Sequence, residues 1–318
     1  MRLVTLRNSG NPAAGVVAGD SILSIPACAE IYPEARCVPA SVRGILESGD
    51  AALDIVRRIL NHVSGAARAE RDRLENCGAL VPAATTELLA PIPDPHLVLS
   101  CGMNYRAHLA EMGAPMPDRP TAFLKSVNAI TGPGAPIILP KNAPDMVDWE
   151  AEFCGVIGRT CHNVPAQEAL NYVAGYTMIN DVSARNWVKP MAQLSGMEAT
   201  QAWDQNLLGK QFPTFCPMGP AVATKEEIAN PNKVSFELKL NGKVMQSANT
   251  DDLAFDLAAL ISFYSQFHVF RPGNVISTGS PAGVGMGRKP FVFLKPGDIV
   301  EIRADGIGTM KNPVKASA

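Results

Sequence analysis

Three acidic side chains alternate in the segment Asp148 to Glu152, immediately before the apolar run Phe153 to Ile157. In a β-strand, alternate residues point to the same face, so Glu150 and Glu152 are expected to lie side by side. Carboxylates this close repel each other unless a cation or a proton lies between them. The spacing therefore predicts a site for a hard divalent ion such as Mg²⁺, with a solvated acidic strand edge as the alternative.

Asp181 is a third candidate ligand, and it comes from a separate segment of the chain. It follows the largely apolar stretch Val173 to Met178 and is not obviously on a surface helix. Together with Glu150 and Glu152, it would supply one face of an octahedral site and leave the other positions for water and a chelating substrate. Arg185, a little further along, could neutralise this group of acids. An aspartate in an ordinary turn is the competing interpretation.

His108 and Glu111 offer a different kind of chemistry within the segment Gly102 to Glu111. If this segment is helical, their i, i+3 spacing places both side chains on one face, so the carboxylate can orient and charge-support the imidazole. Histidine titrates near neutral pH, which suits it to removing a proton from water. Glycines that bracket the segment and prolines that follow it indicate a mobile flap. An ordinary exposed contact between histidine and glutamate is the alternative.

Two lysines and a glycine-rich stretch could bind an anionic substrate. Lys125 and Lys210 are candidates, although a lysine is by default a solvated surface residue. The stretch Ser277 to Gly285 follows an apolar run but lacks the Gly-Lys-Ser/Thr ending of a phosphate-binding loop, so it does not predict a nucleotide site. Its backbone amides and the Thr278 hydroxyl could instead hold a substrate carboxylate, with a plain tight turn as the alternative.

These residues need elements to position them, and the chain divides at a proline-rich segment. The first part contains a predicted strand at Arg2 to Leu6 and a predicted helix across Ala51 to Val63, where apolar residues recur at helical spacing. The run Pro91 to Pro95 stiffens the chain and excludes regular structure. We therefore predict a small N-terminal α/β domain over residues 1–90 and a domain that carries the candidate site over residues 91–318.

Short apolar runs separated by glycine- and proline-containing turns fill the second domain. Their density predicts a β-rich α+β fold, a roll or barrel rather than a doubly wound sheet. Two helices are also predicted, at Ala166 to Tyr172 after Pro165 and at Asp251 to Phe263 after a capping Thr250. The predicted strands are Leu97 to Cys101, Phe153 to Ile157, Val234 to Leu240, Val275 to Thr278 and Ile299 to Arg303.

Composition excludes several classes of protein. Among the 318 residues, 47% are hydrophobic and 18% are charged, which is typical of a globular protein. A net charge of −2 without a basic cluster gives no reason to expect nucleic acid or an anionic membrane as a partner. Seven cysteines without a Cys-x-x-Cys pair predict reduced, mostly buried thiols. Because neither a secretory signal nor an apolar run of about 18 residues is present, we expect a cytoplasmic protein.

The candidate motifs also occur together in a known order. Over residues 95–314 the chain resembles the fumarylacetoacetate hydrolase family, whereas the first 90 residues resemble only its variable N-terminal part. The likeness is dense and ordered, which makes chance agreement a poor explanation. The segments that carry it are Gly102 to Glu111, Phe123 to Lys125, Ile130 to Pro133, Asp148 to Glu152, Gly175 to Thr177, Asn180 to Arg185, Cys216 to Pro220, Ser277 to Gly285 and Gly306 to Thr309.

This resemblance implies a mixed β-sandwich roll that assembles as a homodimer and binds Mg²⁺ or Mn²⁺, with Ca²⁺ able to substitute. In the family pattern, Glu150, Glu152 and Asp181 match the metal ligands. His108 and Glu111 match a catalytic pair carried on a flexible lid. Lysines and a threonine match positions near the substrate or the metal's outer shell. We assign substrate binding to Tyr105, Lys125, Arg185, Thr278 and Gly279, and catalysis to Lys210 in addition to the pair on the lid.

Two features depart from the family pattern. After the matching lysine, the family commonly has an aspartate where this chain has Pro213. The segment Trp187 to Leu208 is longer than in many relatives and contains Met191, Met197 and Trp203, which predicts a remodelled pocket rim. Both features bear on the identity of the substrate more than on metal binding.

The leading functional prediction is hydrolytic carbon–carbon cleavage of an acylpyruvate-type 2,4-dioxo acid, whose carboxylate and 2-oxo group chelate the metal. His108, oriented by Glu111, would deprotonate the attacking water, and the metal would hold the charge of the departing pyruvate enolate. Decarboxylation of oxaloacetate and isomerisation of an unsaturated 2-oxo diacid are alternatives that need no attacking water. A non-enzymatic protein that uses the site as a cation clamp or binds a small molecule is a third. In the enzymatic cases the expected partner is a small 2-oxo acid.

Overall fold

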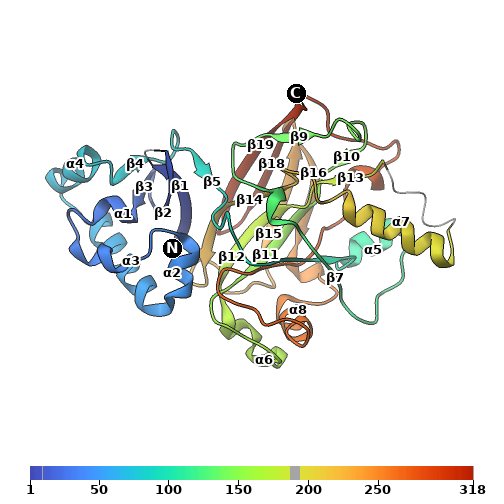
Figure 1. The fold of residues 1–318 in the computed structure, drawn as a ribbon, viewed down its shortest axis with the longest axis horizontal. Helices are drawn as coiled ribbons and strands as arrows, with labels where there is room; N and C mark the ends of the chain where they lie inside the picture. The colour runs from blue at the N-terminus through green and yellow to red at the C-terminus, as the bar shows by residue number, and fades with distance from the viewer. Residues whose placement is uncertain (9, 187–193, 318) are drawn as a thin grey trace.

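The N-terminal part of the chain is an antiparallel sheet with helices gathered around it (Figure 1). The computed structural model describes residues 1–8, 10–186 and 194–317. The strands pair in the order β1 (Arg2–Asn8), β2 (Asn11–Ala18), β3 (Ser21–Ser24) and β4 (Leu80–Pro82). The helices are α1 (Ile25–Cys28), the 3₁₀ helix η1 (Pro33–Cys37), α2 (Val42–Glu47), α3 (Gly49–Ser64) and α4 (Arg68–Asn76).

Helix α3 confirms the helix that apolar spacing predicts at residues 51–63. Ala52, Val56, Ile59 and Val63 recur every three or four positions, and all four are buried on the side of the helix that faces β2. Each fully buried valine or isoleucine contributes roughly 1.5 to 3 kcal/mol, so packing of this face stabilises the helix more than its intrinsic propensity does. The strand predicted at residues 2–6 is also present, as β1.

The boundary between the two parts contains no helix or strand over residues 91–95, as its prolines predict. The sheet nevertheless continues across it, because β1 pairs with β14 (Cys216–Thr224) as well as with β5 (Leu88–Leu89) on its own side of the boundary. Arg43 of α2 also binds Asp94 within the boundary, with 2.5 Å between Nη2 and Oδ2. The division into domains 1–90 and 91–318 stays a prediction.

One long mixed sheet forms the centre of the second part and joins the N-terminal strands through β1. From β1 and β14 it continues through β12 (Val173–Asn180), β11 (Ala151–Ile157), β17 (Val275–Ser277), β6 (Val98–Gly102) and β7 (Thr121–Leu124). These pairings are antiparallel except that β17 runs parallel to β6, and β8 (Ile130–Thr131) also adds to β14 in parallel. All residues of β11 are buried, so both faces of the sheet are covered at its middle.

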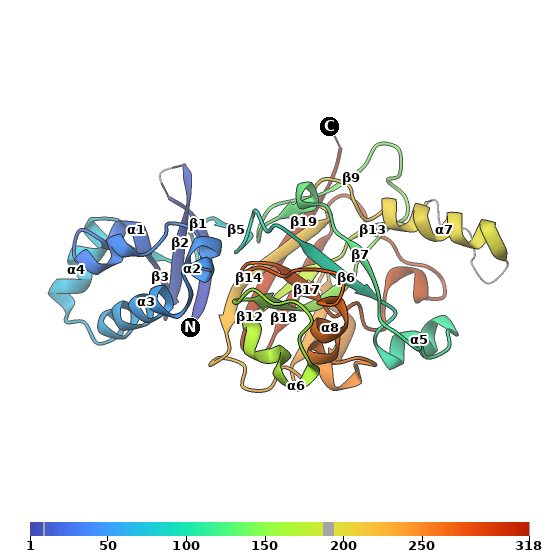
Figure 2. The same ribbon diagram turned by 60° about the horizontal axis from the view of Figure 1, so that its bottom comes forward.

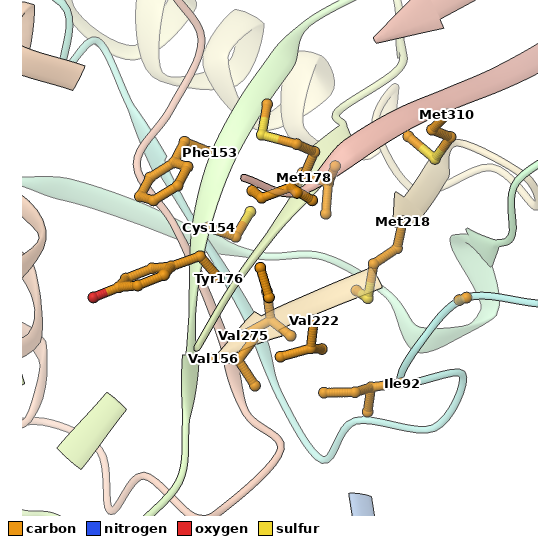
Figure 3. Close-up of a cluster of buried hydrophobic side chains, with 14 of the residues drawn as sticks. Ile92, Phe153, Cys154, Val156, Tyr176, Met178, Met218, Val222, Val275 and Met310 are labelled. Carbon is orange, nitrogen blue, oxygen red and sulfur yellow. The ribbon is translucent and has the colours of Figure 1, made fainter. Parts of the chain in front are cut away.

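A second sheet packs across the first. Its strands follow the order β16 (Lys243–Asn249), β15 (Ser235–Leu240), β18 (Ile299–Ala304), β19 (Gly308–Ala316) and β9 (Ile137–Leu139). Strands β14 and β12 of the long sheet contact β19 and β18. Figure 3 shows part of the buried apolar cluster, which includes Met178 and Met218 of the long sheet, Met310 of β19 and Ile92 of the boundary. These two packed sheets confirm the predicted β-rich α+β fold.

The remaining elements lie around the sheets. The short strands β10 (Val147–Asp148) and β13 (Ser183–Ala184) pair with each other. Figures 1 and 2 both place α5 and α7 at the end of the molecule opposite α4. Within the described ranges, no helix is both long and apolar enough to cross a membrane. The helices of this part are α5 (Arg106–Met112), η2 (Val127–Ala129), α6 (Ala166–Ala169), η3 (Leu170–Tyr172), α7 (Gly196–Leu208), η5 (Thr250–Asp252), α8 (Leu257–Tyr264) and η6 (Gly285–Gly287).

Two helices differ from their predicted bounds. The helix expected at residues 166–172 is split into one α-helical turn, α6, followed by η3. The helix expected from residue 251 begins only at Leu257, because Asp256 is its cap and accepts a 2.8 Å hydrogen bond from the Ala259 amide. Thr250 instead begins the separate turn η5. The strands predicted in this part are all present, as β6, β11, β15, β17 and β18.

Candidate metal centre and lid

Three acidic side chains converge where strands of the long sheet end. Glu150 lies in the break between β10 and β11, Glu152 lies within β11, and Asp181 directly follows β12. The pairing of β11 with β12, and a 2.8 Å hydrogen bond from the Asp181 amide to the Glu150 carbonyl, hold the two segments together. All three side chains are buried, and one oxygen from each lies within 4.8 Å of the other two. We call these three residues the carboxylate cluster; they are the residues predicted as metal ligands.

Two lysines predicted as active-site residues bind the carboxylate cluster directly. The Lys125 ammonium lies 2.5 Å from Oδ1 of Asp181. The Lys210 ammonium lies 2.6 Å from Oδ2 of Asp181 and 2.7 Å from Oε2 of Glu150, and it donates to the Ser183 hydroxyl at 2.8 Å. Exposed fractions of 3% and 4% for Lys125 and Lys210 show that the alternative of solvated surface lysines is wrong.

Arg185 joins the cluster to a fourth buried acid. Its guanidinium pairs with Glu150 through Nη2 and with Asp148 through Nε, the latter at 3.3 Å. Its Nη1 donates to the side chain of Asn206 in α7 at 2.9 Å. Burial raises the pKa of Asp148, and the charge of Arg185 opposes that rise. Because all three donor nitrogens of Arg185 are engaged in this way, the guanidinium is fixed within the protein.

Burial and neighbouring charges give the carboxylates different protonation preferences. Burial raises the pKa of Glu150, but nearby cations, Lys210 first, outweigh this effect and hold the pKa below its ordinary value of 4.5. The pKa of Glu152 lies well above 4.5, because burial and then the charges of Asp181 and Glu150 oppose ionisation. Among the described residues, only the Ser277 hydroxyl donates to the Glu152 carboxylate, at 2.5 Å. Glu152 is therefore the member of the cluster with the least positive charge beside it.

A divalent cation fits this arrangement. Carboxylate oxygens from two segments, all close together, match the oxygen ligands that Mg²⁺ and Mn²⁺ prefer. With Asp148 included, four buried carboxylates face the cations of Lys125, Lys210 and Arg185. A divalent ion held by the carboxylate cluster would supply the positive charge that Glu152 lacks. The donor set does not decide between Mg²⁺, Mn²⁺ and Ca²⁺.

Helix α5, which we call the lid, carries the predicted acid–base pair. His108 Nδ1 lies 2.9 Å from Oε2 of Glu111, so the two side chains share one face of the helix. The other oxygen of Glu111 accepts a 3.0 Å hydrogen bond from the Gly283 amide. Burial raises the pKa of Glu111, but the hydrogen bonds from His108 and Gly283 outweigh it and bring the pKa below 4.5. The lid is therefore docked on the protein through the carboxylate of Glu111 and, at its first turn, through Arg106 and Ala107, which donate to the Leu253 carbonyl and to Asp252.

Residues 277–287, which we call the 277–287 loop, connect the carboxylate cluster to the lid. At its start Ser277 donates to Glu152, and the Thr278 hydroxyl lies 3.4 Å from the hydroxyl of Tyr105, the residue that precedes the lid. In its middle the Gly283 amide binds the lid. One loop thus contacts both parts of the predicted site.

Three residues predicted to bind substrate have structural partners in this loop region. The Thr278 hydroxyl donates to the Phe153 carbonyl at 2.9 Å, and Tyr105 is fully buried. Gly279 has a φ of +89°, and a Cβ there would lie 2.8 Å from the Cys101 carbonyl oxygen, so this turn requires glycine. These contacts explain the residue types without a ligand, and substrate binding by Tyr105, Thr278 and Gly279 stays a prediction.

Comparison with known proteins adds the family. The family model described as fumarylacetoacetate (FAA) hydrolase C-terminal matches residues 98–315, which is more than half of the chain. This chain belongs to the fumarylacetoacetate hydrolase family. The matched region contains the whole carboxylate cluster, the lid and the 277–287 loop, and it begins just beyond the proline-rich boundary.

Two curated relatives in this family are similar over most of their length. The chain is 36% identical over 318 residues to a mitochondrial oxaloacetate tautomerase of Xenopus laevis, covering 99% of this chain and 90% of that protein. It is 39% identical over 277 residues to a mitochondrial oxaloacetate tautomerase of Homo sapiens, covering 87% of this chain and 80% of that protein. These relatives agree better with the alternative prediction, an oxaloacetate decarboxylase or an isomerase of an unsaturated 2-oxo diacid, than with the leading prediction of hydrolysis.

Solved structures of the fumarylacetoacetate hydrolase family share the fold along the whole chain. A 5-carboxymethyl-2-hydroxymuconate delta-isomerase from Mycobacterium smegmatis is 32% identical with a TM-score of 0.69. A maleylpyruvate hydrolase from Sphingobium sp. SYK-6, solved with manganese(II) and pyruvate, is 26% identical with a TM-score of 0.70. In both comparisons 100% of each chain is covered. The predicted family fold is thus confirmed, and both isomerases and hydrolases use it.

The expectation of a cytoplasmic protein is wrong. The relatives in Xenopus laevis and Homo sapiens are both mitochondrial proteins. That expectation rested on the lack of a secretory signal and of a long apolar run. Neither feature distinguishes the cytoplasm from the mitochondrion.

Sequence reasoning misses several residues that complete the site. The Ser277 hydroxyl donates to Glu152, and the Ser183 hydroxyl accepts from Lys210. The Asn206 side chain accepts from Arg185. Serine and asparagine are common in turns, so their types carry no signal of this role. Asp148 does carry a signal, because it belongs to the alternating acidic segment Asp148 to Glu152. Its role is different from that of a metal ligand, since Arg185 and backbone amides surround it.

The predicted pocket rim is partly described. Trp187 and Met191 lie outside the described residues. Within α7, Met197 is 71% exposed, whereas the ring of Trp203 would lie 3.7 Å from a Cβ added to Gly102. Trp203 therefore packs beside the chain that leads into the lid. Pro213, the other departure from the family pattern, lies in a turn after α7, and its effect on the substrate stays a prediction.

Proposed function

We propose that this chain interconverts the enol and keto forms of a small 2-oxo diacid of the oxaloacetate class, with a divalent ion held by the carboxylate cluster. The observation that carries the proposal is the buried cluster itself, three carboxylates within 4.8 Å with Glu152 short of positive charge. The relatives named oxaloacetate tautomerases support this choice of reaction, since one of them matches 99% of the chain.

The reaction requires only proton transfers. Conversion of the enol to the keto form removes one proton from the 2-hydroxyl oxygen and adds one proton at C3, so the equation balances without another reactant. A bound divalent ion supplies positive charge to the carboxylate and 2-oxo oxygens of the substrate. Hydrolysis would need the same enolate chemistry and, in addition, a positioned water and a second carbonyl group.

The side chains of this chain divide the remaining work. Lys125 and Lys210 keep positive charge beside the cluster, where a dianionic substrate would add negative charge. Glu111 orients His108 through Nδ1, which leaves the other ring nitrogen, Nε2, to take up or deliver the proton. The lid that carries this pair excludes water from the site while it is docked.

The proposal is tested by following the loss of the enol absorbance of oxaloacetate, measured against the uncatalysed reaction in the same buffer. We expect acceleration in proportion to enzyme, loss of activity with a chelator, and recovery with Mg²⁺ or Mn²⁺. Proton uptake at C3 in D₂O should yield deuterated keto acid. Rates equal to buffer at every metal concentration would overturn the proposal.

Hydrolysis of an acylpyruvate is the second candidate. It is favoured by the similarity to the maleylpyruvate hydrolase that was solved with manganese(II) and pyruvate. Incubation with acylpyruvates in ¹⁸O-labelled water distinguishes the two, because only hydrolysis places ¹⁸O in the carboxylic acid product. Release of carbon dioxide from oxaloacetate would instead identify a decarboxylase.

The homodimer implied by the family resemblance belongs to the same proposal. Each chain carries a complete carboxylate cluster, with every contact described above made within one chain. Light scattering during size-exclusion chromatography should give twice the chain mass of 33.8 kDa. A mass of 33.8 kDa at micromolar concentration would contradict the dimer and leave the proposed chemistry standing.

A further inference from the structure

Among the described residues of the region, Asp148 is the one fully buried acid that does not belong to the carboxylate cluster. Every contact it makes is with a donor: it accepts from the amides of Trp149 at 2.8 Å, Gly285 at 2.6 Å and Met286 at 3.2 Å, and it pairs with Arg185. Its side chain is 0% exposed. It therefore has no oxygen positioned to receive substrate, and the reaction proposed above assigns it nothing.

The contacts of Asp148 run in two directions. On one side Arg185 continues to Glu150, a member of the carboxylate cluster. On the other side the two amides of residues 285 and 286 belong to the 277–287 loop, whose Gly283 amide holds the lid. A single buried carboxylate thus links a candidate metal ligand to the docking place of the lid.

The docking place depends closely on the path of this loop. A Cβ added to Gly287 would lie 2.6 Å from Cδ of Glu111, so the carboxylate rests directly against the loop backbone. The tie from Gly283 to Glu111 is a single hydrogen bond of 3.0 Å. A small shift of the 277–287 loop would therefore break that bond or produce a clash.

We propose that Asp148 is a positioning residue that couples occupancy of the carboxylate cluster by a divalent ion to docking of the lid. An ion that draws Glu150 into one position also fixes Arg185 and Asp148, and through the amides of Gly285 and Met286 it fixes the loop that receives Glu111. Coupling of this kind is reciprocal, so the docked lid also strengthens ion binding. The inference rests on the proposed metal-dependent function and adds to it a route by which the lid senses the ion.

Hydrogen exchange of the metal-free protein, with and without Mn²⁺ and without substrate, tests this coupling. The reporters are the amides of the lid and the amide of Gly283, which Glu111 protects. In the wild type we expect Mn²⁺ to slow exchange at both reporters by about fivefold or more, the lower end of ordinary coupling energies. No effect of bound Mn²⁺ on these amides would overturn the proposal.

The variant Asp148→Asn keeps the size of the side chain and removes the charge that holds Arg185. We expect it to bind Mn²⁺ about 10- to 100-fold more weakly, as is typical when an outer partner of a metal ligand is lost. At saturating Mn²⁺, its lid amides should exchange as in the metal-free state. Wild-type protection of the lid in saturated Asp148→Asn would also overturn the proposal.

Asn206→Ala is the matched control, because Asn206 also holds Arg185 but does not contact the 277–287 loop in any described contact. It should weaken Mn²⁺ binding and leave the Mn²⁺-dependent protection of the lid intact.

If Asp148→Asn does not fold, judged by exchange in the distant β15 and β18, Arg185→Lys replaces it. A lysine keeps the positive charge but lacks the planar guanidinium that pairs with Asp148 and Glu150 at once, so Mn²⁺-dependent protection of the lid should fall. Persistence of that protection would count against coupling through Asp148. Because substrate is absent, failure of the tautomerase assay leaves these results interpretable.

Discussion

The carboxylate cluster and the lid are held in opposite ways. The cluster lies at the ends of central strands, and Glu152 and Asp181 are 1% and 0% exposed. Three cationic side chains and a hydroxyl bind its oxygens. The lid is a short helix at the end of the molecule, and the carboxylate of Glu111 is held by His108 and one backbone amide.

In the proposed function, this difference assigns binding to one region and chemistry to the other. Buried charge pairs lose several kcal/mol when one partner is removed, so the cluster cannot rearrange without cost. A helix tied by few hydrogen bonds can open at much lower free energy. In that proposal, a rigid cation site is combined with an acid–base pair on a helix that can open, so that substrate can enter, react in a closed site and leave.

Loss of a ligand should have the largest effect. Glu152→Gln removes one carboxylate from the cluster and keeps its hydrogen bond to Ser277 available. We expect Mn²⁺ affinity to fall by more than about 100-fold, beyond the loss typical for outer-sphere partners, with activity lost at ordinary metal concentrations. Calorimetric titration of metal-free protein measures the affinity. If this variant bound Mn²⁺ with wild-type affinity, the metal would have to bind somewhere other than the carboxylate cluster.

Loss of the lid carboxylate should separate chemistry from binding. Glu111→Gln removes the charge that orients His108, and we expect kcat to fall by about 10²- to 10⁴-fold, the usual contribution of an acid–base group. Mn²⁺ affinity should stay far closer to the wild-type value than that of Glu152→Gln. Glu198→Gln, at an exposed position of α7, is the control and should leave both quantities unchanged. Full activity of Glu111→Gln would remove the lid pair from the mechanism.

Loss of a buried cation should affect stability more than any change on the lid. Lys210→Met leaves Glu150 and Asp181 without their shared ammonium, so we expect the free energy of unfolding to fall by about 3 kcal/mol, the lower end for broken buried pairs. Mn²⁺ should restore part of this loss, because it supplies positive charge at the same place. Urea unfolding with and without Mn²⁺ measures both. An unchanged free energy of unfolding would show that Lys210 is not needed to offset the repulsion between the Glu150 and Asp181 carboxylates.

Lowering the pH should release the lid before it unfolds the cluster. The pKa of Glu111 is depressed in the folded protein, so its contribution to docking is present above its ordinary pKa of 4.5 and is lost as pH falls through the lower folded value. Hydrogen exchange of the lid, corrected for intrinsic rates, should be constant above pH 5 and rise below about pH 4.5. The variant Glu111→Gln should show no such step, and a step in that variant would assign the titration elsewhere.

The smallest effect should be on thiol reactivity around the cluster. All seven cysteines are free, and Cys37 is the exposed one. Burial raises the pKa of Cys216, beside the cluster, to about 12, so its reactive thiolate is scarce at neutral pH. We expect a maleimide to label Cys37 rapidly and Cys216 only after unfolding, as mass spectrometry of peptides would show. Fast labelling of Cys216 would mean that the cluster region opens often.

The sequence predicts the parts of this site that depend on local spacing. Alternation places Glu152 and its neighbours at a strand, and i, i+3 spacing places His108 beside Glu111, because one strand or one turn of helix fixes each arrangement. The apolar runs likewise predict β6, β11, β15, β17 and β18, since buried strands are continuous in apolar residues.

Long-range pairing escapes such reasoning. Asp148 binds the amides of Gly285 and Met286, which follow it by 137 and 138 positions in the chain. Lys125 and Asp181 are 56 positions apart. No local pattern encodes contacts at such separations. Helix α7 is missed because only Ala202 and Asn206 of it are buried, too few for a recognisable apolar stripe. The choice between hydrolysis, decarboxylation and isomerisation escapes sequence reasoning for a different reason: one arrangement of carboxylates serves all of these reactions.

The central claim is that Glu150, Glu152 and Asp181 share one divalent ion. Crystals soaked in Mn²⁺, with data collected at the manganese absorption edge, test it directly through the anomalous difference map. We predict a single strong peak in each chain, about 2.0 to 2.6 Å from an oxygen of each of the three side chains. A map with no peak at this place would contradict the account. So would a peak elsewhere in a structure where Lys125 and Lys210 still pair with the carboxylates.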